Sequence, residues 1–276
     1  MKPISEQITL VTGATDGLGK GIALALAQLG ATVLLHGRDQ SRLESTRAEI
    51  LTATGSDRLE TYRADFSSLD EVRSLAENLL KQHPRLDLLI NNAGIVGGSP
   101  GDTQRRFSRE GYELVFAVNY LAPFLLTHLL LPALRHTPPN RIINVASAGQ
   151  SPIQFDNVMM ERGYEPLAAY RQSKLAQVMF TIDLADRLKN DGITVNSLHP
   201  ASLMPTKMVF EYFGRTMSSI DDGVNAVMRL AADPKLDTVT GKYFDEQREA
   251  QANAQAYDAA ARQKLWQLSE ELTGLA

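Results

Sequence analysis

Cysteine is absent from the whole sequence. The chain can therefore form no disulfide bond, and it has neither a thiolate nucleophile nor a thiolate metal ligand to offer. An excess of one charge is also missing, since 28 basic residues face 32 acidic ones and leave a formal net charge of −4. Such a balance gives no general attraction to nucleic acid or to an acidic membrane surface. The composition fits a protein of a reducing compartment, without a nucleic-acid partner.

A long uninterrupted hydrophobic run is lacking as well. The most apolar stretch, residues 124–134, contains His128 and Pro132. It is shorter than the roughly 20 residues that a membrane-spanning helix needs. The first predicted strand begins close to the N-terminus, which leaves no room for a signal peptide. We therefore expect a soluble, cytoplasmic protein without a membrane anchor.

The hydrophobic residues that are present, 43% of 276, suffice for one substantial core. Short β-branched runs alternate with longer helical patterns, which favours a parallel sheet with helices on both faces. No repeat or linker divides the chain, so residues 1–276 are predicted to form a single α/β domain with a doubly wound, seven-stranded parallel sheet. The predicted strands cover residues 7–12, 32–36, 59–63, 87–91, 140–146, 192–198 and 241–244. The predicted helices cover residues 17–29, 40–54, 68–82, 107–135, 167–189, 222–232 and 251–272.

A glycine-rich turn joins the first predicted strand to the first predicted helix. Strand, glycine turn and helix in this order are typical of a dinucleotide-binding unit. Gly13 would make the tight turn, Gly17 would let the backbone approach a pyrophosphate, and Gly19 would let the helix lie close to the strand. The diphosphate would then bind at the positive end of the helix. The same prediction includes the other residues of the turn, Thr15, Asp16 and Leu18. A loop that merely needs glycines is the alternative, which the flanking strand and helix disfavour.

Tyr170 and Lys174 are four residues apart in a strongly helical segment. This spacing places both side chains on one face of the helix, where the lysine charge could lower the pKa of the phenol from its ordinary value of ~10. A tyrosine tuned in this way could give a proton to a carbonyl, or take one from an alcohol, while a hydride crosses to or from the same carbon. Taken alone, the pair could equally be a chance arrangement on a helix surface.

Five motifs occur together and in one order along the chain. They are the TGxxxGxG spacing, the segment Asn91-Asn92-Ala93-Gly94, Asn119, Ser147 and the YxxSK pentad that begins at Tyr170. Together they resemble the short-chain dehydrogenase/reductase family over residues 8–243. The resemblance implies a Rossmann-type fold and an NAD(P)-dependent enzyme that acts on CH–OH or C=O groups.

The resemblance also implies a catalytic group of four residues. Tyr170 would be the acid in the reductive direction and the base in the oxidative one. Ser147 would hydrogen-bond the substrate carbonyl and stabilise negative charge on its oxygen. Lys174 would hold the nicotinamide ribose and keep the phenol acidic, and Asn119 would position a water that links the lysine to solvent. Each residue also has a structural reading, such as a helix cap or kink for Asn119 and a turn for Ser147. No metal site is predicted.

The end of the second predicted strand bears on the choice of cofactor. An NAD-preferring site places a carboxylate there, which would repel a 2′-phosphate. Gly37 occupies the position of the family's acid, and Arg38 follows with a guanidinium suited to phosphate oxygens. NADP is therefore expected rather than NAD. In the alternative, Arg38 is a solvated charge and Asp39 supplies the missing acid.

Two further segments correspond to cofactor contacts in the family. Asp65 follows the third predicted strand at the position of an adenine-contacting aspartate, although capping a helix beside Ser67 is an alternative. Asn92, Ala93 and Gly94 end the fourth strand, where the resemblance implies that small side chains admit the cofactor ring.

The sixth predicted strand ends in His199, Pro200 and Ala201. Pro200 is expected to contact the cofactor. Ala201 replaces the glycine usual in the family, and Thr206 comes one residue later than in the common pattern, which puts its backbone contacts to the nicotinamide in doubt. His199 is predicted to be structural, since Tyr170 already fills the acid/base role.

The long interval between Ser147 and Tyr170 resembles the branch with retinol dehydrogenases and protochlorophyllide reductases. Residues 201–217 carry methionines and large rings that suit a lid over an apolar substrate, although core packing or a subunit contact would also explain them. Residues 249–275 could cover the pocket, pack on the sheet or join subunits in a homo-oligomer, a dimer or tetramer. The leading hypothesis is an NADP(H)-dependent oxidoreductase of small, largely apolar carbonyls and alcohols. The alternatives are a non-catalytic NADP(H)-binding regulatory or scaffold protein and, ranked last, a sugar-nucleotide epimerase or dehydratase.

Overall fold

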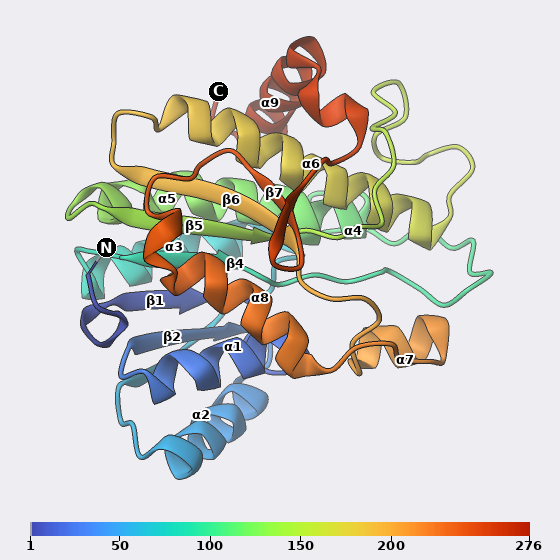
Figure 1. Ribbon diagram of the computed structural model, residues 1–276. Helices are drawn as coiled ribbons and strands as arrows, with labels where there is room; N and C mark the ends of the chain where they lie inside the picture. Colours follow the sequence, from blue (N-terminus) through green and yellow to red (C-terminus); the bar gives the residue numbers. More distant parts are fainter. Residues whose placement is uncertain (1) are drawn as a thin grey trace.

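Seven parallel strands form the centre of the protein in the computed structural model, which describes residues 2–276 (Figure 1). An eighth strand lies antiparallel at one edge, and the order is β3-β2-β1-β4-β5-β6-β7-β8. The strands are β1 (Ile8–Val11), β2 (Thr32–Gly37), β3 (Leu59–Arg63), β4 (Leu88–Asn91), β5 (Asn140–Val145), β6 (Ile193–His199), β7 (Tyr243–Asp245) and β8 (Arg248–Ala250). Winding reverses between β1 and β4, and parallel α/β sheets bind ligands beyond the carboxyl ends of the strands at such a point.

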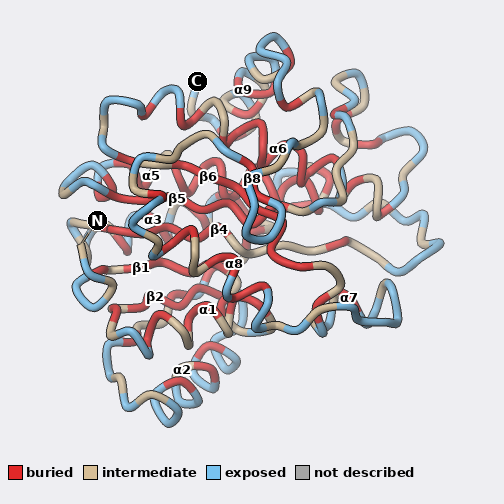
Figure 2. The backbone as a smooth tube through the Cα atoms, viewed as in Figure 1, coloured by how far each residue is buried: buried red, intermediate tan, exposed pale blue. Residues whose placement is uncertain are grey.

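Helices cover both faces of the sheet, as predicted. One face carries α1 (Gly17–Gln28), α2 (Gln40–Thr54) and α8 (Ile220–Ala232). The other carries α3 (Leu69–Gln82), α5 (Ala122–Arg135) and α6 (Pro166–Arg187), with α9 (Ala259–Thr273) packed outside α6 (Figure 1). Every residue of β4 and β5 is buried, which explains why these strands read as continuous runs rather than as alternating patterns (Figure 2).

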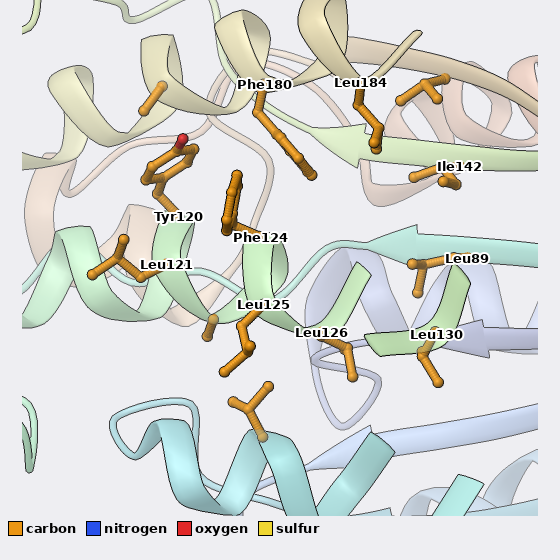
Figure 3. Close-up of a cluster of buried hydrophobic side chains, with 14 of the residues drawn as sticks. Leu89, Tyr120, Leu121, Phe124, Leu125, Leu126, Leu130, Ile142, Phe180 and Leu184 are labelled. Carbon is orange, nitrogen blue, oxygen red and sulfur yellow. The ribbon is translucent and has the colours of Figure 1, made fainter. Parts of the chain in front are cut away.

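The larger core fills the face of the sheet that α3, α5 and α6 cover, extends to α9 and includes a group of aromatic rings (Figure 3). The ring centroid of Phe124 is 5.1 Å from that of Phe180 and 5.3 Å from that of Trp266. The hydroxyl of Tyr120, which is fully buried, pairs with Ser269 Oγ at 2.7 Å. Together with the ring contact between Phe180 and Trp266 at 6.0 Å, these contacts anchor α9 on α5 and on α6, the helix that carries Tyr170 and Lys174.

The apolar run that contains residues 124–134 belongs to a longer helical stretch than predicted. Leu114–Arg135 forms 22 residues of continuous helix, and its most apolar 18-residue window has a mean hydropathy of 1.9, so the helix is long and apolar enough to cross a membrane. The sequence argument from length is therefore wrong for this helix. Of that 18-residue window, 83% is buried inside the protein. A buried core helix can have the same length and composition as a membrane-spanning helix.

Two of the predicted helices begin later in the chain than expected. The predicted helix 107–135 begins only at α4 (Leu114–Phe116), because Phe107 and Glu113 pair as a β-bridge and Gly111 has a φ of +86°. It then passes through the π turn Ala117–Leu121 before α5. The predicted helix 251–272 begins at Ala259, after a 3-10 turn at Ala254–Tyr257.

The sheet has eight strands rather than the predicted seven. After β7 the chain turns at Glu246, whose φ is +52°, and returns as β8, which pairs antiparallel with β7. The sequence signal is weak, because β8 is only three residues long and its first two, Arg248 and Glu249, are exposed. Charged side chains on a short edge strand discourage pairing with another molecule. A further helix, α7 (Lys207–Phe213), lies within the predicted lid segment.

Candidate active site

The glycine turn has the geometry that the sequence predicts. Gly13 and Gly17 have φ values of +67° and +47°, in the region that side chains disfavour. A Cβ on Gly13 would lie 2.9 Å from the Cα of Ala93, and one on Gly19 would overlap the carbonyl oxygen of Gly13. Asp16 caps α1 by accepting a hydrogen bond from the backbone N–H of Gly17 at 2.8 Å. The turn therefore brings bare backbone to the N-terminus of α1, a site suited to a diphosphate.

Thr12 and Asn92 hold this turn against the end of β4. The Thr12 hydroxyl accepts hydrogen bonds from the backbone N–H groups of Asn92 at 2.9 Å and Ala93 at 3.0 Å. Asn92 Nδ2 donates to the carbonyl of Thr12 at 2.8 Å. The segment 92–94 thus supports the turn directly. Thr12 was missing from the predicted site residues, although its place immediately before Gly13 could have identified it.

His36 is a second supporting residue that the sequence analysis missed. Its Nδ1 accepts a hydrogen bond from the backbone N–H of Gly13 at 3.3 Å, and its Nε2 pairs with the Ala64 carbonyl at 3.1 Å. The ring stacks on Phe66 with centroids 4.2 Å apart. Burial lowers the pKa of His36 to about 4, so the imidazole is neutral at pH 7 and can donate from one nitrogen while accepting at the other.

Arg38 lies immediately beyond β2 and is exposed. Its guanidinium makes no ion pair with any residue of 2–276, whereas the nearby Arg42 pairs with Asp16 at 3.1 Å. The side chain of Thr15 packs against Gly37, where a Cβ would lie 2.7 Å from Thr15 Cγ2. Among the residues that the structure describes, Arg38 is thus a cation without an ion-pair partner at the strand end where the sequence predicts a 2′-phosphate.

Asp65 follows β3 and is half-buried. Its Oδ1 accepts a hydrogen bond from the backbone N–H of Ser67 at 2.9 Å, while the cap of α3 is Ser68. Asp65 therefore shapes the turn before α3 without capping the helix itself. Its predicted contact to adenine stays a prediction.

Tyr170 and Ser147 meet in the structure. Ser147 follows β5 and Tyr170 lies in the second turn of α6, and the side chain of Ser147 is close enough to that of Tyr170 to lower the pKa of the phenol. Ser147 Oγ also accepts from the backbone N–H of Gly149 at 3.0 Å. The Ser147 carbonyl accepts from Gln150 Nε2 at 2.8 Å and from Tyr243 Oη at 3.2 Å. These bonds fix the serine from both sides.

Lys174 lies one turn further along α6, with its Nζ 5.6 Å from the ring centroid of Tyr170. The ammonium donates to the carbonyl of Val145 at 2.8 Å and to Gln177 Oε1 at 2.9 Å. A Cβ on Gly94 would lie 3.5 Å from Nζ, so the lysine reaches the end of β4. Burial lowers the pKa of Lys174 to about 7.

The expected lowering of the phenol pKa by the lysine is not found. Burial raises the pKa of Tyr170, and the neighbouring Ser147 opposes this rise only in part. Lys174 makes no contribution to the shift, and burial lowers its own pKa. The phenol therefore holds its proton at neutral pH and can act as a proton donor.

Asn119 lies in the π turn and is fully buried. Its Oδ1 accepts from the backbone N–H of Ile95 at 2.8 Å, and its Nδ2 donates to the Ile95 carbonyl at 2.9 Å and to Ser173 Oγ at 3.0 Å. A Cβ on Gly94 would lie 3.4 Å from Asn119 Oδ1. The side chain therefore ties the segment after β4 to α6, and it makes no hydrogen bond to Lys174.

The segment after β6 returns to the glycine turn. Pro200 is buried, and Thr206 lies so close to Gly17 that a Cβ there would be 2.8 Å from Thr206 Cγ2. The later position of Thr206 in the sequence therefore does not keep it from the site. His199 pairs through Nε2 with Ser202 Oγ at 3.1 Å, and burial lowers its pKa, as suits the structural role predicted for it.

The residues fit a nicotinamide dinucleotide. The glycine turn lies at the N-terminus of α1 and packs against the segment that follows β4. In that segment, Gly94 lies beside Lys174, which is one helical turn from Tyr170 and its neighbour Ser147. Within residues 2–276, no group of three or more histidine, aspartate or glutamate side chains could hold a metal ion. A doubly wound sheet with these features defines a dinucleotide-binding oxidoreductase.

Comparison with known proteins identifies the family. Residues 7–214 match the family model of the short chain dehydrogenases, and the chain belongs to this family. It is 36% identical to retinol dehydrogenase 13 of Mus musculus, over 99% of this chain and 85% of the relative. It is 35% identical to retinol dehydrogenase 11 of Homo sapiens, over 98% of this chain and 86% of the relative. The predicted branch is thereby confirmed.

Solved structures agree with this assignment. An uncharacterised protein from Mycobacterium paratuberculosis superimposes with a TM-score of 0.79 at 28% identity, covering 98% of this chain and 94% of the other. A short chain dehydrogenase from Escherichia coli, solved in complex with NADPH, gives 0.73 at 28% identity, over 88% of this chain and 97% of the other. The 3-ketoacyl-(acyl-carrier-protein) reductase from Brucella melitensis, solved with NADH, gives 0.71 at 27% identity, over 88% and 99%. The protein is an NAD(P)-dependent oxidoreductase.

Proposed function

We propose that this protein uses NADP(H) to interconvert a carbonyl and an alcohol on a small, largely apolar substrate, with Tyr170 as the acid and base. The proposal rests on the meeting of Tyr170 and Ser147 at the end of β5, with Lys174 Nζ 5.6 Å from the centroid of the Tyr170 ring. Two hydroxyl groups at that position can both reach the oxygen atom of one carbonyl. A structural role alone would not require three polar side chains to converge at the end of a buried strand.

The chemistry divides between cofactor and protein. NADPH, when bound, supplies the hydride to the carbonyl carbon. Ser147 donates a hydrogen bond to the carbonyl oxygen and stabilises the negative charge that develops there. Tyr170 transfers its proton to the same oxygen, and the burial that raises the pKa of Tyr170 keeps that proton in place until it is needed. Lys174 binds the nicotinamide ribose, and its charge assists the phenol in the oxidative direction. In this proposal, Asn119 keeps a water between the π turn and the lysine.

Arg38 supports NADP over NAD. The carboxylate that would favour NAD is absent from the position of Gly37, and the exposed guanidinium that follows has no ion-pair partner in residues 2–276. An arginine in that setting can bind a phosphate with two parallel hydrogen bonds. Asp39, the alternative acid, caps α2 by accepting from the backbone N–H of Arg42 at 3.0 Å. That bond holds Asp39 at the N-terminus of α2.

An apolar substrate is supported by the walls near Tyr170 and by the names of the relatives. Ile95, Val115, Met160 and Tyr164 pack in one apolar cluster with Tyr170. The relatives named above are retinol dehydrogenases, and retinol is a long apolar alcohol. We propose that residues 201–217, which include α7, form a lid over this substrate. We also propose that the protein is a single domain, soluble and cytoplasmic. The roles of residues 249–275 and of a homo-oligomer stay predictions.

The test combines purified protein with a panel of apolar aldehydes and ketones and with either NADPH or NADH, and follows cofactor absorbance. We expect turnover of at least one carbonyl, with NADPH preferred. The non-catalytic alternative predicts binding of NADPH without turnover of any member. Binding of NADH as tight as that of NADPH would contradict the cofactor choice alone.

A further inference from the structure

Gln177 lies three residues beyond Lys174 on α6 and outside every motif that the sequence analysis singled out. Its side chain is only 2% exposed. Its Oε1 accepts a hydrogen bond from Lys174 Nζ at 2.9 Å, beside the bond from Nζ to the Val145 carbonyl at 2.8 Å. The lysine of the proposed catalytic group is thus held by two acceptors, one from a strand and one from its own helix.

The orientation of the Gln177 amide follows from the lysine. Its Nε2 is buried and has no hydrogen-bond partner among residues 2–276. Leaving a buried donor unpaired is unfavourable, so another contact must hold the amide in this orientation. A charged amine has only donors, and a flipped amide would place its NH₂ group against them. The contact of Oε1 with Nζ therefore decides how the amide lies.

This contact also determines the direction of the remaining N–H. An ammonium has three N–H groups, and Val145 and Gln177 accept two of them. The third points away from both acceptors. Gly94, where a Cβ would lie 3.5 Å from Nζ, and the Tyr170 ring, whose centroid is 5.6 Å away, border the other sides of Nζ. That N–H is the one available to a cofactor ribose or to the phenol.

We propose that Gln177 is a positioning residue, which holds Lys174 so that its third N–H faces the cofactor and Tyr170. The kinetic consequences rest on the proposed function, whereas the position and protonation of the lysine do not. Gln177 is buried against Lys174 and acts on the reaction only through it.

The surroundings of Lys174 make the effect of Gln177 measurable. Burial is the cause of the lowered pKa of Lys174, and no carboxylate opposes it. Tyr170 is the titratable group that faces Nζ from its own helix, whereas β5 presents the Val145 carbonyl, the segment after β4 presents Gly94, and the π turn presents Asn119. None of these three is charged. Removing a neutral acceptor should therefore lower the pKa of the lysine further.

The direct experiment titrates Lys174 in the ligand-free protein by NMR of isotope-labelled lysine, with the signal assigned from Lys174→Met. In Gln177→Leu we expect the midpoint to fall by about one pH unit, the size typical of a lost hydrogen bond to a charged group. Gln172→Leu is the matched control, since Gln172 is also buried on α6 but bonds Gln154 and Val158. The control should leave the midpoint unchanged.

Two further variants and one kinetic measurement complete the test. Gln177→Glu should move the midpoint above that of the wild type, because a carboxylate favours the charged lysine. If Gln177→Leu does not fold, Gln177→Met, which keeps the length of the side chain, replaces it. In turnover with NADPH, Gln177→Leu should lose about tenfold in kcat near pH 8 and less near pH 6, where more of the lysine is charged.

An unchanged midpoint in Gln177→Leu, or an equal fall in Gln172→Leu, would overturn the inference. Absence of turnover in the wild-type protein would instead contradict the proposed function, and the NMR midpoint would still decide the role of Gln177.

Discussion

The two sides of the proposed site differ in how tightly they are built. On the cofactor side, Gly13, Thr12 and His36 are joined by hydrogen bonds or backbone contacts that leave no room for an added atom. On the proposed substrate side, α7 and the loop after it expose Phe210, Phe213 and Met217 at 56%, 41% and 69%. The first side is a fixed backbone cradle, whereas the second is an apolar surface. The comparison indicates that cofactor binding demands exact backbone positions and that substrate choice depends on adaptable side chains.

Gly13→Ala should have the largest effect, a loss of cofactor affinity. Gly163 has the same φ of +67° but has nothing within 4 Å of an added Cβ, whereas Gly13 would meet Ala93 at 2.9 Å. Both alanine variants carry a left-handed strain of about 1–2 kcal/mol. We expect only Gly13→Ala to lose about 100-fold or more in NADPH affinity, measured by fluorescence titration, since only there does the cradle shift. Equal losses in the two variants would assign the effect to backbone strain.

The second largest effect should be the pH dependence that His36 gives to the free energy of unfolding. Its folded-state pKa of about 4 lies below the ordinary 6.5, so between these values the unfolded chain binds the proton and the folded protein does not. Stability should be at its full value above pH 6.5 and should fall by about 3 kcal/mol as the pH drops through 4. Urea unfolding of the wild type and of His36→Gln at pH 7 and pH 4 measures this, and the pH-dependent loss should shrink in the variant. Parallel curves for both proteins would exclude His36 as the cause.

Arg38→Leu should produce a more selective loss. A hydrogen bond to a charged group contributes about 1.5–3 kcal/mol, which corresponds to about 10- to 100-fold in the Kd for NADPH. Affinity for NADH should change little, because NADH has no 2′-phosphate. Arg42→Leu is the control, since Arg42 already pairs with Asp16. If both cofactors lose affinity equally in Arg38→Leu, the arginine supports the fold of the turn and not the phosphate.

The smallest effect should come from the adaptable side. Phe213→Ser changes an exposed ring, so stability should stay within about 0.5 kcal/mol. We expect KM for an apolar carbonyl to rise about threefold to tenfold, with NADPH affinity unchanged. Leu51→Ser, which alters an exposed apolar side chain on α2, is the control for a nonspecific effect. An unchanged KM in Phe213→Ser would remove α7 from the proposed lid.

The cofactor side was also the more predictable side. Glycine spacing and the strand before it specify a local backbone path, and Gly13, Gly17 and Gly19 adopt it. The predicted group of Ser147, Tyr170 and Lys174 converges, because the strand order brings β5 and α6 together at the same edge. Each of these features depends on short-range pattern or on the parallel topology, both of which a sequence can reveal.

Other parts depend on contacts between distant segments. His36 bonds Gly13 and Ala64, and nothing in its strand distinguishes it from a core residue. The pKa values of Tyr170 and Lys174 follow from burial, which spacing along a helix does not measure. The strand β8 and the late start of α9 at Ala259 depend on how the C-terminal chain packs against the rest. These features could be found only in the folded structure.

In the proposed reaction, the Tyr170 phenol delivers the proton to the substrate carbonyl. Tyr170→Phe removes that hydroxyl and keeps the ring in its place on α6. With NADPH and a carbonyl that the wild type reduces, we predict that kcat falls about a thousandfold while the Kd for NADPH stays within about twofold. Turnover within tenfold of the wild type, with cofactor binding intact, would contradict the account.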